Sequence, residues 1–258
     1  MLHINLRAFS CKARLVGICL GAMLTLTLPV QALDTDALNK ALAGAPRDEA
    51  DKARDAGRNP AGVLDFLGLE KGMTVVDVIA AGGYYTEVLS IAVGESGKVF
   101  AQNPAGVLRF RDGANDKALT ARLADNRLPN VVRVDRELDD VGIPSRSVHL
   151  VITALNFHDV YNNSPEAAVG MLQLMGLMLK PGGVIGIVDH HGNPGADNAA
   201  LHRMQVDQAI EAAETAGFDV EQSDLLTNPD DDRSQMVFAP DIRGKTDRFL
   251  LKLTLPED

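Results

Sequence analysis

The stretch of sequence that decides the fold is MTVVDVIAAGGYYTEVL, residues 73–89. Its first part, Met73 to Ile79, is a mostly β-branched apolar run, which is typical of a strand buried on both faces. Residues 80–83, Ala-Ala-Gly-Gly, lack bulky side chains, and a helix is expected from Tyr85 onward. Small residues let a ligand approach the backbone, and the first N–H groups of a helix are free to bind it. Glycines at such a turn are explained either by a bound ligand or by close packing of a helix on the sheet.

Strand-like and helix-like patterns alternate along the rest of the chain. Such alternation indicates βαβ units around a parallel sheet with helices on both faces, an α/β fold. Asn59 and Pro60 suit the N-cap and the first position of a helix. Further strands are expected at 98–102, 131–135, 148–155, 184–189, 218–226 and 249–255, and helices at 85–93, up to about 126, at 165–179 and at 196–216.

The first 32 residues differ from the remainder of the chain. Arg7, Lys12 and Arg14 precede an apolar run over residues 15–28, and the small-residue sequence Val-Gln-Ala ends at Ala32. A basic start, a short apolar middle and a small-residue end predict a secretory signal peptide over 1–32. The run is shorter than the roughly 20 residues of a spanning helix, so we expect export to the bacterial periplasm without stable membrane insertion.

Composition excludes several classes of function. The 258 residues are 46% hydrophobic and 23% charged, which fits a soluble globular protein. Cys11 and Cys19 both lie in the leader, so the mature chain has neither a disulfide nor a cysteine nucleophile. The net charge is −10, and the leader removes basic residues only. An acidic body argues against nucleic acid or an anionic membrane as the main partner.

Polar side chains follow several of the expected strands at their carboxyl ends. In an open parallel sheet, ligands bind outside the carboxyl ends of the strands, so these side chains are expected to line one cleft. They are Gln102 and Asn103, then Asp135, then Asn156, His158 and Asp159, and finally Asp189, His190 and His191.

With these motifs the sequence resembles the class I S-adenosylmethionine (SAM) dependent methyltransferases, and more narrowly a group of bacterial methyltransferases with signal peptides. The resemblance covers about residues 55–258. It rests on VVDVIAAGGYYT (75–86), LNFHD (155–159), LKPGG (179–183), VDH (188–190), LHR (201–203), AGF (216–218) and RGKTDRF (243–249). It implies a Rossmann-like, open twisted sheet of seven strands, mostly parallel with an antiparallel last strand. The implied domains are a signal peptide at 1–32, a helical extension at 33–57 and a methyltransferase-like domain at 58–258.

The resemblance also implies a cofactor site for SAM. Asp77 would lie near the amino group of the methionine part, and the turn would lie against the ligand. The family usually has an acid after the second strand to bind the ribose hydroxyls, whereas this chain has Asn103, which lacks the charge of a carboxylate. The implied cofactor-binding residues are Asp77, Ala80, Ala81, Gly82, Gly83, Tyr85, Asn103, Asp135 and Asn156.

The implied reaction is methyl transfer to a small-molecule acceptor. His158 is the candidate base, with Asp159 orienting its ring and Asn156 shaping the acceptor pocket. These residues could instead cap their loop by hydrogen bonding. The alternative function is an exported non-catalytic or metal-binding protein on a degenerate methyltransferase fold. Its metal ligands could come from His158, Asp159, Asp189, His190, His191 and His202, with His158, Asp189 and His190 as the preferred set. His202 and Arg203 could also bind a carboxylate or phosphate, and the acidic run 230–232 is expected to be a solvated turn.

Overall fold

The computed structural model describes residues 33–256. The expected leader and its cleavage site therefore lie outside the described residues. Among those described, no helix is both long and apolar enough to cross a membrane.

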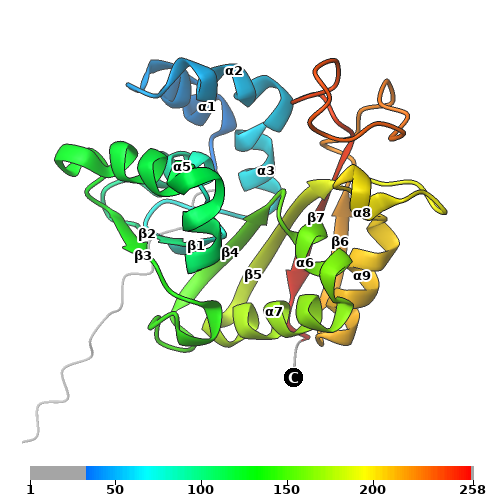
Figure 1. The fold of residues 1–258 in the computed structure, drawn as a ribbon. Helices are drawn as coiled ribbons and strands as arrows, with labels where there is room; N and C mark the ends of the chain where they lie inside the picture. The colour runs from blue at the N-terminus through cyan, green and yellow to red at the C-terminus, as the bar shows by residue number, and fades with distance from the viewer. Residues whose placement is uncertain (1–32, 257–258) are drawn as a thin grey trace, which may run out of the picture. The chain divides into compact units, whose positions relative to one another are not determined.

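Seven strands form one sheet in the order β3-β2-β1-β4-β5-β7-β6 (Figure 1). The first five run parallel to their neighbours, and β7 is antiparallel to both β5 and β6. This is the expected mostly parallel sheet, with its antiparallel last strand inserted beside β5. The strands are β1 Thr74–Val78, β2 Lys98–Gln102, β3 Val131–Val134, β4 Val148–Ala154, β5 Leu179–His190, β6 Asp219–Ser223 and β7 Arg248–Thr254.

Helices cover both faces of the sheet. They are α1 Thr35–Gly44, α2 Glu49–Arg58, α3 Pro60–Phe66, α4 Tyr84–Val93, α5 Ala105–Leu123, α6 Phe157–Asn163, α7 Pro165–Met178, α8 Asn198–Leu201 and α9 Val206–Thr215. Short 3₁₀ turns lie at Ala124–Asn126 and Leu138–Asp140. Asn59 caps α3 and Pro60 begins it, as the sequence predicts.

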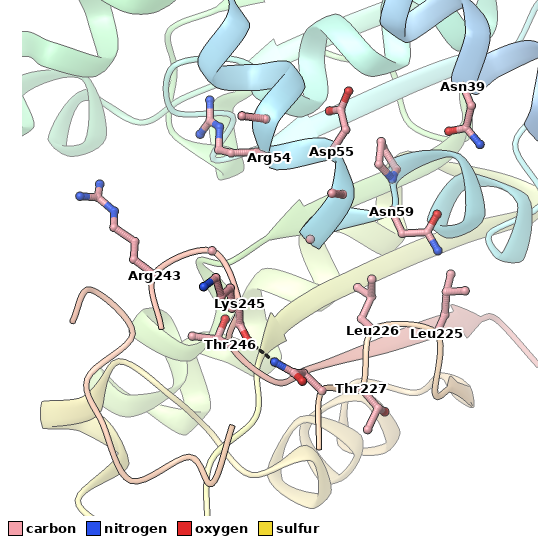
Figure 2. Close-up of a pocket in the computed structure, with 16 residues that line it drawn as sticks. Asn39, Arg54, Asp55, Asn59, Leu225, Leu226, Thr227, Arg243, Lys245 and Thr246 are labelled. Carbon is pink, nitrogen blue, oxygen red and sulfur yellow. Dashed lines mark hydrogen bonds between the residues drawn. The ribbon is translucent and has the colours of Figure 1, made fainter. Parts of the chain in front are cut away.

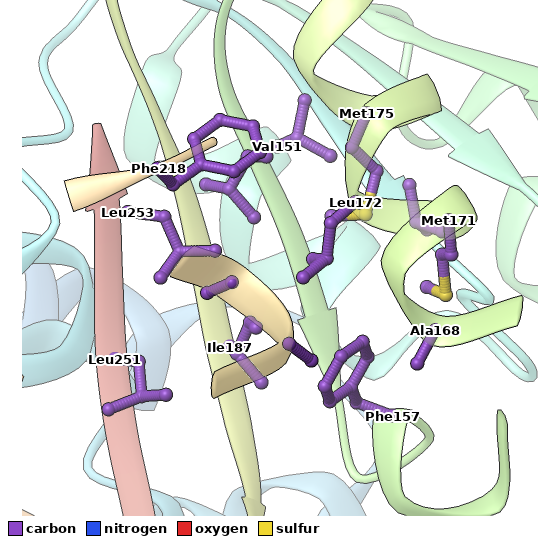
Figure 3. Packing of buried hydrophobic residues seen from close by; sticks show 14 of the residues in the cluster. Val151, Phe157, Ala168, Met171, Leu172, Met175, Ile187, Phe218, Leu251 and Leu253 are labelled. Carbon is purple, nitrogen blue, oxygen red and sulfur yellow. The ribbon is translucent and has the colours of Figure 1, made fainter. Parts of the chain in front are cut away.

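The core has two layers because side chains alternate between the faces of each strand. On one face, Val151, Ile187 and Leu251 pack against Leu172 and Met175 of α7 (Figure 3). The Met- and Leu-rich helix is thus core packing. On the other face the adjacent strand residues, among them Val75, Leu150 and Leu250, pack against α1, α3 and α4.

The segment 33–57 is part of this second layer. Leu38 and Leu42 of α1 are buried in the same cluster as α3 and α4. Asp34 and Asp48 each cap a helix by accepting a backbone hydrogen bond. Residues 33–256 consequently belong to one compact unit.

Several of the expected elements have different bounds, among them β6, which spans Asp219–Ser223 rather than 218–226. The helix expected over 196–216 is broken into α8 and α9, because His202 adopts a left-handed backbone (φ 53°) and Met204 pairs with His191 beside the sheet. Strand β5 begins at Leu179 rather than at Val184, with an irregular register against β4. Helix α6, which begins directly after β4, is not anticipated by the sequence pattern.

Candidate functional site

A cleft of about 520 Å³ lies at the carboxyl ends of β1 and β4. Its walls come from the turn after β1, the start of α6, the end of β5, and helices α2, α4 and α5. Of the residues singled out in the sequence, it brings together Asp77, Ala80, Ala81, Gly82, Tyr85, Asn156, His158, Asp159 and His190. Gly83, Asn103, Asp135 and Asp189 do not line it.

Asp77 is the buried acid at the end of β1. Its carboxylate accepts a hydrogen bond from the Thr86 hydroxyl at 2.6 Å and forms no ion pair with any residue between 33 and 256. Burial raises the pKa of Asp77 to about 7, against the opposing effects of the Thr86 hydrogen bonds and of the charges on Arg58 and Arg122. Such a group favours a cationic neighbour, because a cation would relieve the cost of ionising it.

The turn after β1 has a strained backbone. Ile79 and Ala81 both have positive φ, 55° and 50°, which is rare for residues with side chains and especially for a β-branched one. Strain of this kind persists only where the surroundings hold it. Here Ile79 N donates to Gln102 Oε1 at 3.1 Å, and Ala81 N donates to Asn103 Oδ1 at 2.8 Å.

Gln102 and Asn103 therefore hold the turn. The Asn103 amide also donates to Ala81 O at 3.2 Å, and the Gln102 amide donates to Arg136 O at 2.7 Å. Both side chains are buried and neither lines the cleft. The resemblance implies that Asn103 binds the ribose hydroxyls of SAM. In this arrangement its amide does not offer that contact, because its nitrogen and its oxygen are both hydrogen-bonded to Ala81.

The glycines of the turn are explained by helix packing. A Cβ at Gly82 would lie 3.1 Å from the Cβ of Ala118, and one at Gly83 would lie 2.9 Å from a methyl of Leu119. Arg122, one turn further along α5, donates from Nε to Gly82 O at 2.8 Å. Helix α5 thus packs directly against Gly82 and Gly83, and Gly82 also borders the cleft.

Asp135 lies away from the cleft. Its carboxylate accepts two hydrogen bonds of 2.8 Å from Arg133 Nε on the exposed side of β3. The sequence placed it at the cleft because it follows a strand of the sheet. Strand β3 is the outermost strand, however, and its end is two strands removed from β1.

His158 is the centre of a buried network at the start of α6. Its Nδ1 lies 2.7 Å from Asp189 Oδ1, and its backbone N–H donates to Asp189 Oδ2 at 2.7 Å. Asp189 also accepts from the backbone N–H of His190 at 2.7 Å. Burial lowers the pKa of His158, but the charges and hydrogen bonds of Asp189 and Asp159 outweigh it and raise that pKa to about 10.

The other edge of the His158 ring faces the cleft. Its Nε2 is buried and forms an ion pair with Asp159, lying 3.2 Å from Asp159 Oδ1. The same carboxylate oxygen lies 3.0 Å from His202 Nδ1. His158, Asp159 and His202 can thus offer three ligand atoms within 4.8 Å of one another.

The alternative ligand set of His158, Asp189 and His190 is arranged differently. Asp189 is occupied by three hydrogen bonds, and the His190 Nδ1 lies 2.8 Å from the Thr246 hydroxyl. Within residues 33–256, the group that converges is the one containing His202. His191 lies outside it, beside Asp247 and Arg233.

Asn156 joins the ends of β1 and β4. Its amide donates to Ile79 O at 3.1 Å and to Ala154 O at 2.7 Å. Its side chain borders the cleft and, through these two hydrogen bonds, links the end of β1 to the end of β4.

Arg203 belongs to the structure rather than to the cleft. It is fully buried, and its guanidinium donates to the Asp231 carboxylate, to His191 O and to Gln235 O. Asp231 is likewise buried, whereas Asp230 and Asp232 on either side are exposed. The expectation of a solvated turn holds for the outer two acids and is wrong for Asp231.

Sequence reasoning missed the arginines of the cleft. Arg54 and Arg58, near the end of α2, line it together with Arg122 of α5. The guanidinium of Arg58 lies 4.2 Å from the ring centroid of Tyr84, whose hydroxyl donates to Asp55 at 2.7 Å. Tyr85 is buried with its hydroxyl unpartnered, and burial raises its pKa to about 12. The sequence did not single out these arginines, because α2 carries many charged residues and such a helix is usually interpreted as solvent-exposed.

Comparison with known proteins identifies the fold. No family model matches the sequence, and no curated protein is found as a relative. Solved structures do match. A SAM-dependent methyltransferase from Aquifex aeolicus is 21% identical, with a TM-score of 0.59 over 86% of this chain and 99% of that one.

Two further structures match at 18% identity. A SAM-dependent O-methyltransferase from Thermotoga maritima has a TM-score of 0.52 over 86% of this chain and 72% of its own. An arsenic(III) SAM methyltransferase from Chlamydomonas reinhardtii has a TM-score of 0.51 over 85% and 74%. The chain therefore has the Rossmann-like fold of class I methyltransferases.

Proposed function

We propose that the protein is a SAM-dependent methyltransferase that acts on a small-molecule acceptor. The observation that carries the proposal is the cleft at the carboxyl ends of β1 and β4, with the unpaired carboxyl of Asp77 at its base. This is the place where an open α/β sheet binds its ligands, and the fold is shared with SAM-dependent enzymes.

The residues fit one end of the cofactor better than the other. Asp77 can accept an ammonium group, and the backbone after β1 borders the cleft. At the ribose end, neither Gln102 nor Asn103 has a free polar group. When bound, SAM would supply an activated methyl group. The protein would hold it mainly through the methionine part.

His158 is better suited to donate a hydrogen bond than to accept a proton. With a pKa raised to about 10, its ring is cationic at neutral pH. A general base needs a pKa near the working pH. The buried Nε2–H is instead a donor beside the Asp159 carboxylate, where it can help orient an acceptor that already carries a lone pair or a charge.

Binding measurements test the proposal. Isothermal titration of the purified protein with SAM and S-adenosylhomocysteine should give a saturable heat for both. Asp77→Asn should abolish or greatly weaken it, whereas Asp219→Asn, at an exposed carboxylate of β6, should leave it unchanged. The proposal is wrong if the wild-type protein gives no heat and no thermal shift at millimolar ligand.

A divalent metal site is the second candidate function. It is favoured by the convergence of His158, Asp159 and His202, because two imidazoles and one carboxylate suit Zn, Mn or Fe. Elemental analysis of the purified protein should then find one metal per chain. His202→Gln should lose it, and His149→Gln, at the opposite end of β4, should keep it. Purified protein that contains no metal and binds SAM would exclude the metal-binding function.

We also propose that residues 1–32 direct export and are then removed. The basic start, the short apolar run and the small residues before Leu33 support this. Mass spectrometry of the protein recovered from the periplasm of a bacterial host should find a chain that begins at Leu33. Full-length protein in the cytosol would contradict it.

A further inference from the structure

A second, smaller pocket of about 260 Å³ adjoins the cleft. The two share part of their walls, namely Arg54, Arg58, Leu155, His190 and Phe238. Arg243, from the segment between β6 and β7, and Arg248, the first residue of β7, add to the pocket. Four arginines thus line it, and no carboxylate does.

Three of these arginines have no anionic partner among residues 33–256. Arg54 pairs with Asp51, but Arg58, Arg243 and Arg248 form no ion pair within the described chain. Burial lowers the pKa of Arg58, and burial together with the charge of Arg58 lowers that of Arg248 to about 10. Both shifts have the direction expected of cations that lack compensation.

Buried arginines elsewhere in the protein are compensated. Arg47 pairs with Asp55 at 2.6 Å, and Arg203 pairs with Asp231 at 2.9 Å. Arg122 contacts Asp51 at 2.7 Å. In a chain with 35 acidic and 25 basic residues, a pocket of arginines without a carboxylate is an exception. Of the four, Arg248 is buried and Arg58 half-buried, whereas Arg54 and Arg243 are exposed. Unpaired charge is costly where it is buried, as on Arg248, so the cluster is a candidate binding site for an anion.

Structural roles account for only part of this cluster. Arg248 donates to Gly57 O at 2.7 Å and to the Thr246 hydroxyl at 3.2 Å, which joins β7 to the end of α2. Arg58 lies over the Tyr84 ring. Neither contact neutralises a charge, and the side chain of Arg243 makes no hydrogen bond to any described residue.

The pocket is enclosed by close contact between α2 and the segment 224–247. A Cβ at Gly57 would lie 2.4 Å from Gly244 O, so the two backbones touch. A larger cavity of about 880 Å³ shares Arg54, Arg243 and Gly244 with this pocket, and Figure 2 shows Arg54 coming from α2 and Arg243 from the segment 224–247. The arginines therefore come from elements that are fixed against one another.

We propose that this arginine pocket binds a carboxylate or phosphate group of the methyl acceptor. The proposal rests on the proposed methyltransferase function and names the class of substrate. Guanidinium groups bind both kinds of anion through paired, charge-assisted hydrogen bonds. His190 and Leu155 form a common wall, and the ring centroids of His158 and His190 are 5.8 Å apart. An acceptor anchored at the arginines thus reaches the His158 end of the cleft.

Simple anions test the pocket. We would titrate inorganic phosphate and propionate at constant ionic strength, with chloride as reference, and follow the thermal unfolding midpoint. One of the two should stabilise the wild-type protein with a saturable dependence, and which one does so identifies the anionic group. In Arg243→Gln the dissociation constant should rise about tenfold, the loss of one charge-assisted hydrogen bond. Arg146→Gln, an exposed arginine before β4, should behave as the wild type.

S-Adenosylhomocysteine binding, measured on the same variants, separates the two proposals. Unchanged affinity in Arg243→Gln together with weakened anion binding supports an acceptor site. If Arg243→Gln weakens S-adenosylhomocysteine as much as it weakens the anion, the arginines serve the cofactor and the proposal is overturned. It is also overturned if neither anion stabilises the wild type more than chloride. Failure of S-adenosylhomocysteine to bind the wild type would refute the methyltransferase function instead.

Discussion

The affinity for S-adenosylhomocysteine should depend on pH through Asp77. In the free protein its pKa is raised to about 7, so below neutrality the buried carboxyl is mostly protonated. The ammonium group of the ligand attracts the ionised form. Binding therefore releases most of a proton at pH 6 and only about 0.1 at pH 8, and the affinity rises as the pH rises through 7.

The size of the effect follows from that pKa. If the bound form is fully ionised, the dissociation constant at pH 5.5 should be about 30 times that at pH 8. At pH 6 about 0.9 proton should be released for each ligand bound. The charges that face Asp77 are those of Arg58 and Arg122. His158 stays charged, since its pKa is about 10, and His190 stays neutral because burial lowers its pKa well below the usual value.

Isothermal titration in pairs of buffers with different ionisation heats measures both quantities. The slope of the observed heat against the buffer heat gives the number of protons released. In Asp77→Asn both the release and the pH dependence should disappear, and the remaining affinity should be weak. A dissociation constant that does not vary between pH 5.5 and 8, with no proton release, would show that the ligand's ammonium group does not bind at Asp77.

Three substitutions test the surroundings of the cleft. Gly83→Ala should destabilise the protein by about 1–3 kcal/mol in urea unfolding, because residue 83 has φ 84° and its Cβ would meet Leu119, whereas Gly44→Ala, in open space at the end of α1, should be neutral or stabilising. Asp189→Asn breaks the buried pair with His158, so it should cost about 3–5 kcal/mol and return the pKa of that histidine toward 6.5, as NMR titration would show. Asn103→Asp should cost about 1–3 kcal/mol, because the carboxylate faces the Ala81 carbonyl, and should not tighten S-adenosylhomocysteine binding. Tighter binding in this last variant would instead show that residue 103 contacts the ribose.

Local patterns were sufficient to predict the sheet. The β-branched run that becomes β1, the Lys-Pro-Gly-Gly turn of β5 and the Ala-Gly-Phe before β6 each specify an element through a short-range property. The end of every parallel strand then falls at one edge, which is why Asp77, Asn156 and His158 meet as expected. The antiparallel last strand was supplied by the resemblance and not by the pattern, and the order of the strands was not predicted. Asp135 was misplaced because strand order decides which strand ends are neighbours.

Side-chain partners could not be predicted, because they depend on residues far apart in the chain. Asn103 bonds to Ala81, 22 positions earlier, and Arg248 bonds to Gly57, 191 positions earlier. Polarity tells which residues require a partner, but it does not tell which partner they find. The arginine pocket was missed for this reason, since its four members come from two segments of the sequence at opposite ends of the chain.

The amide side chain of Asn103 is suited to the strained backbone of the turn after β1. Residue 103 holds the backbone at Ala81 in a left-handed conformation, and an amide does so by donating and accepting at once, whereas a carboxylate could only accept. The amide at position 103 thus fits a turn that has alanine at a strained position. Charge without an ionic partner occurs in two places, on Asp77 at the end of β1 and on Arg58 and Arg248 in the arginine pocket, and under the two proposals a cofactor would neutralise the first and an anionic acceptor the second.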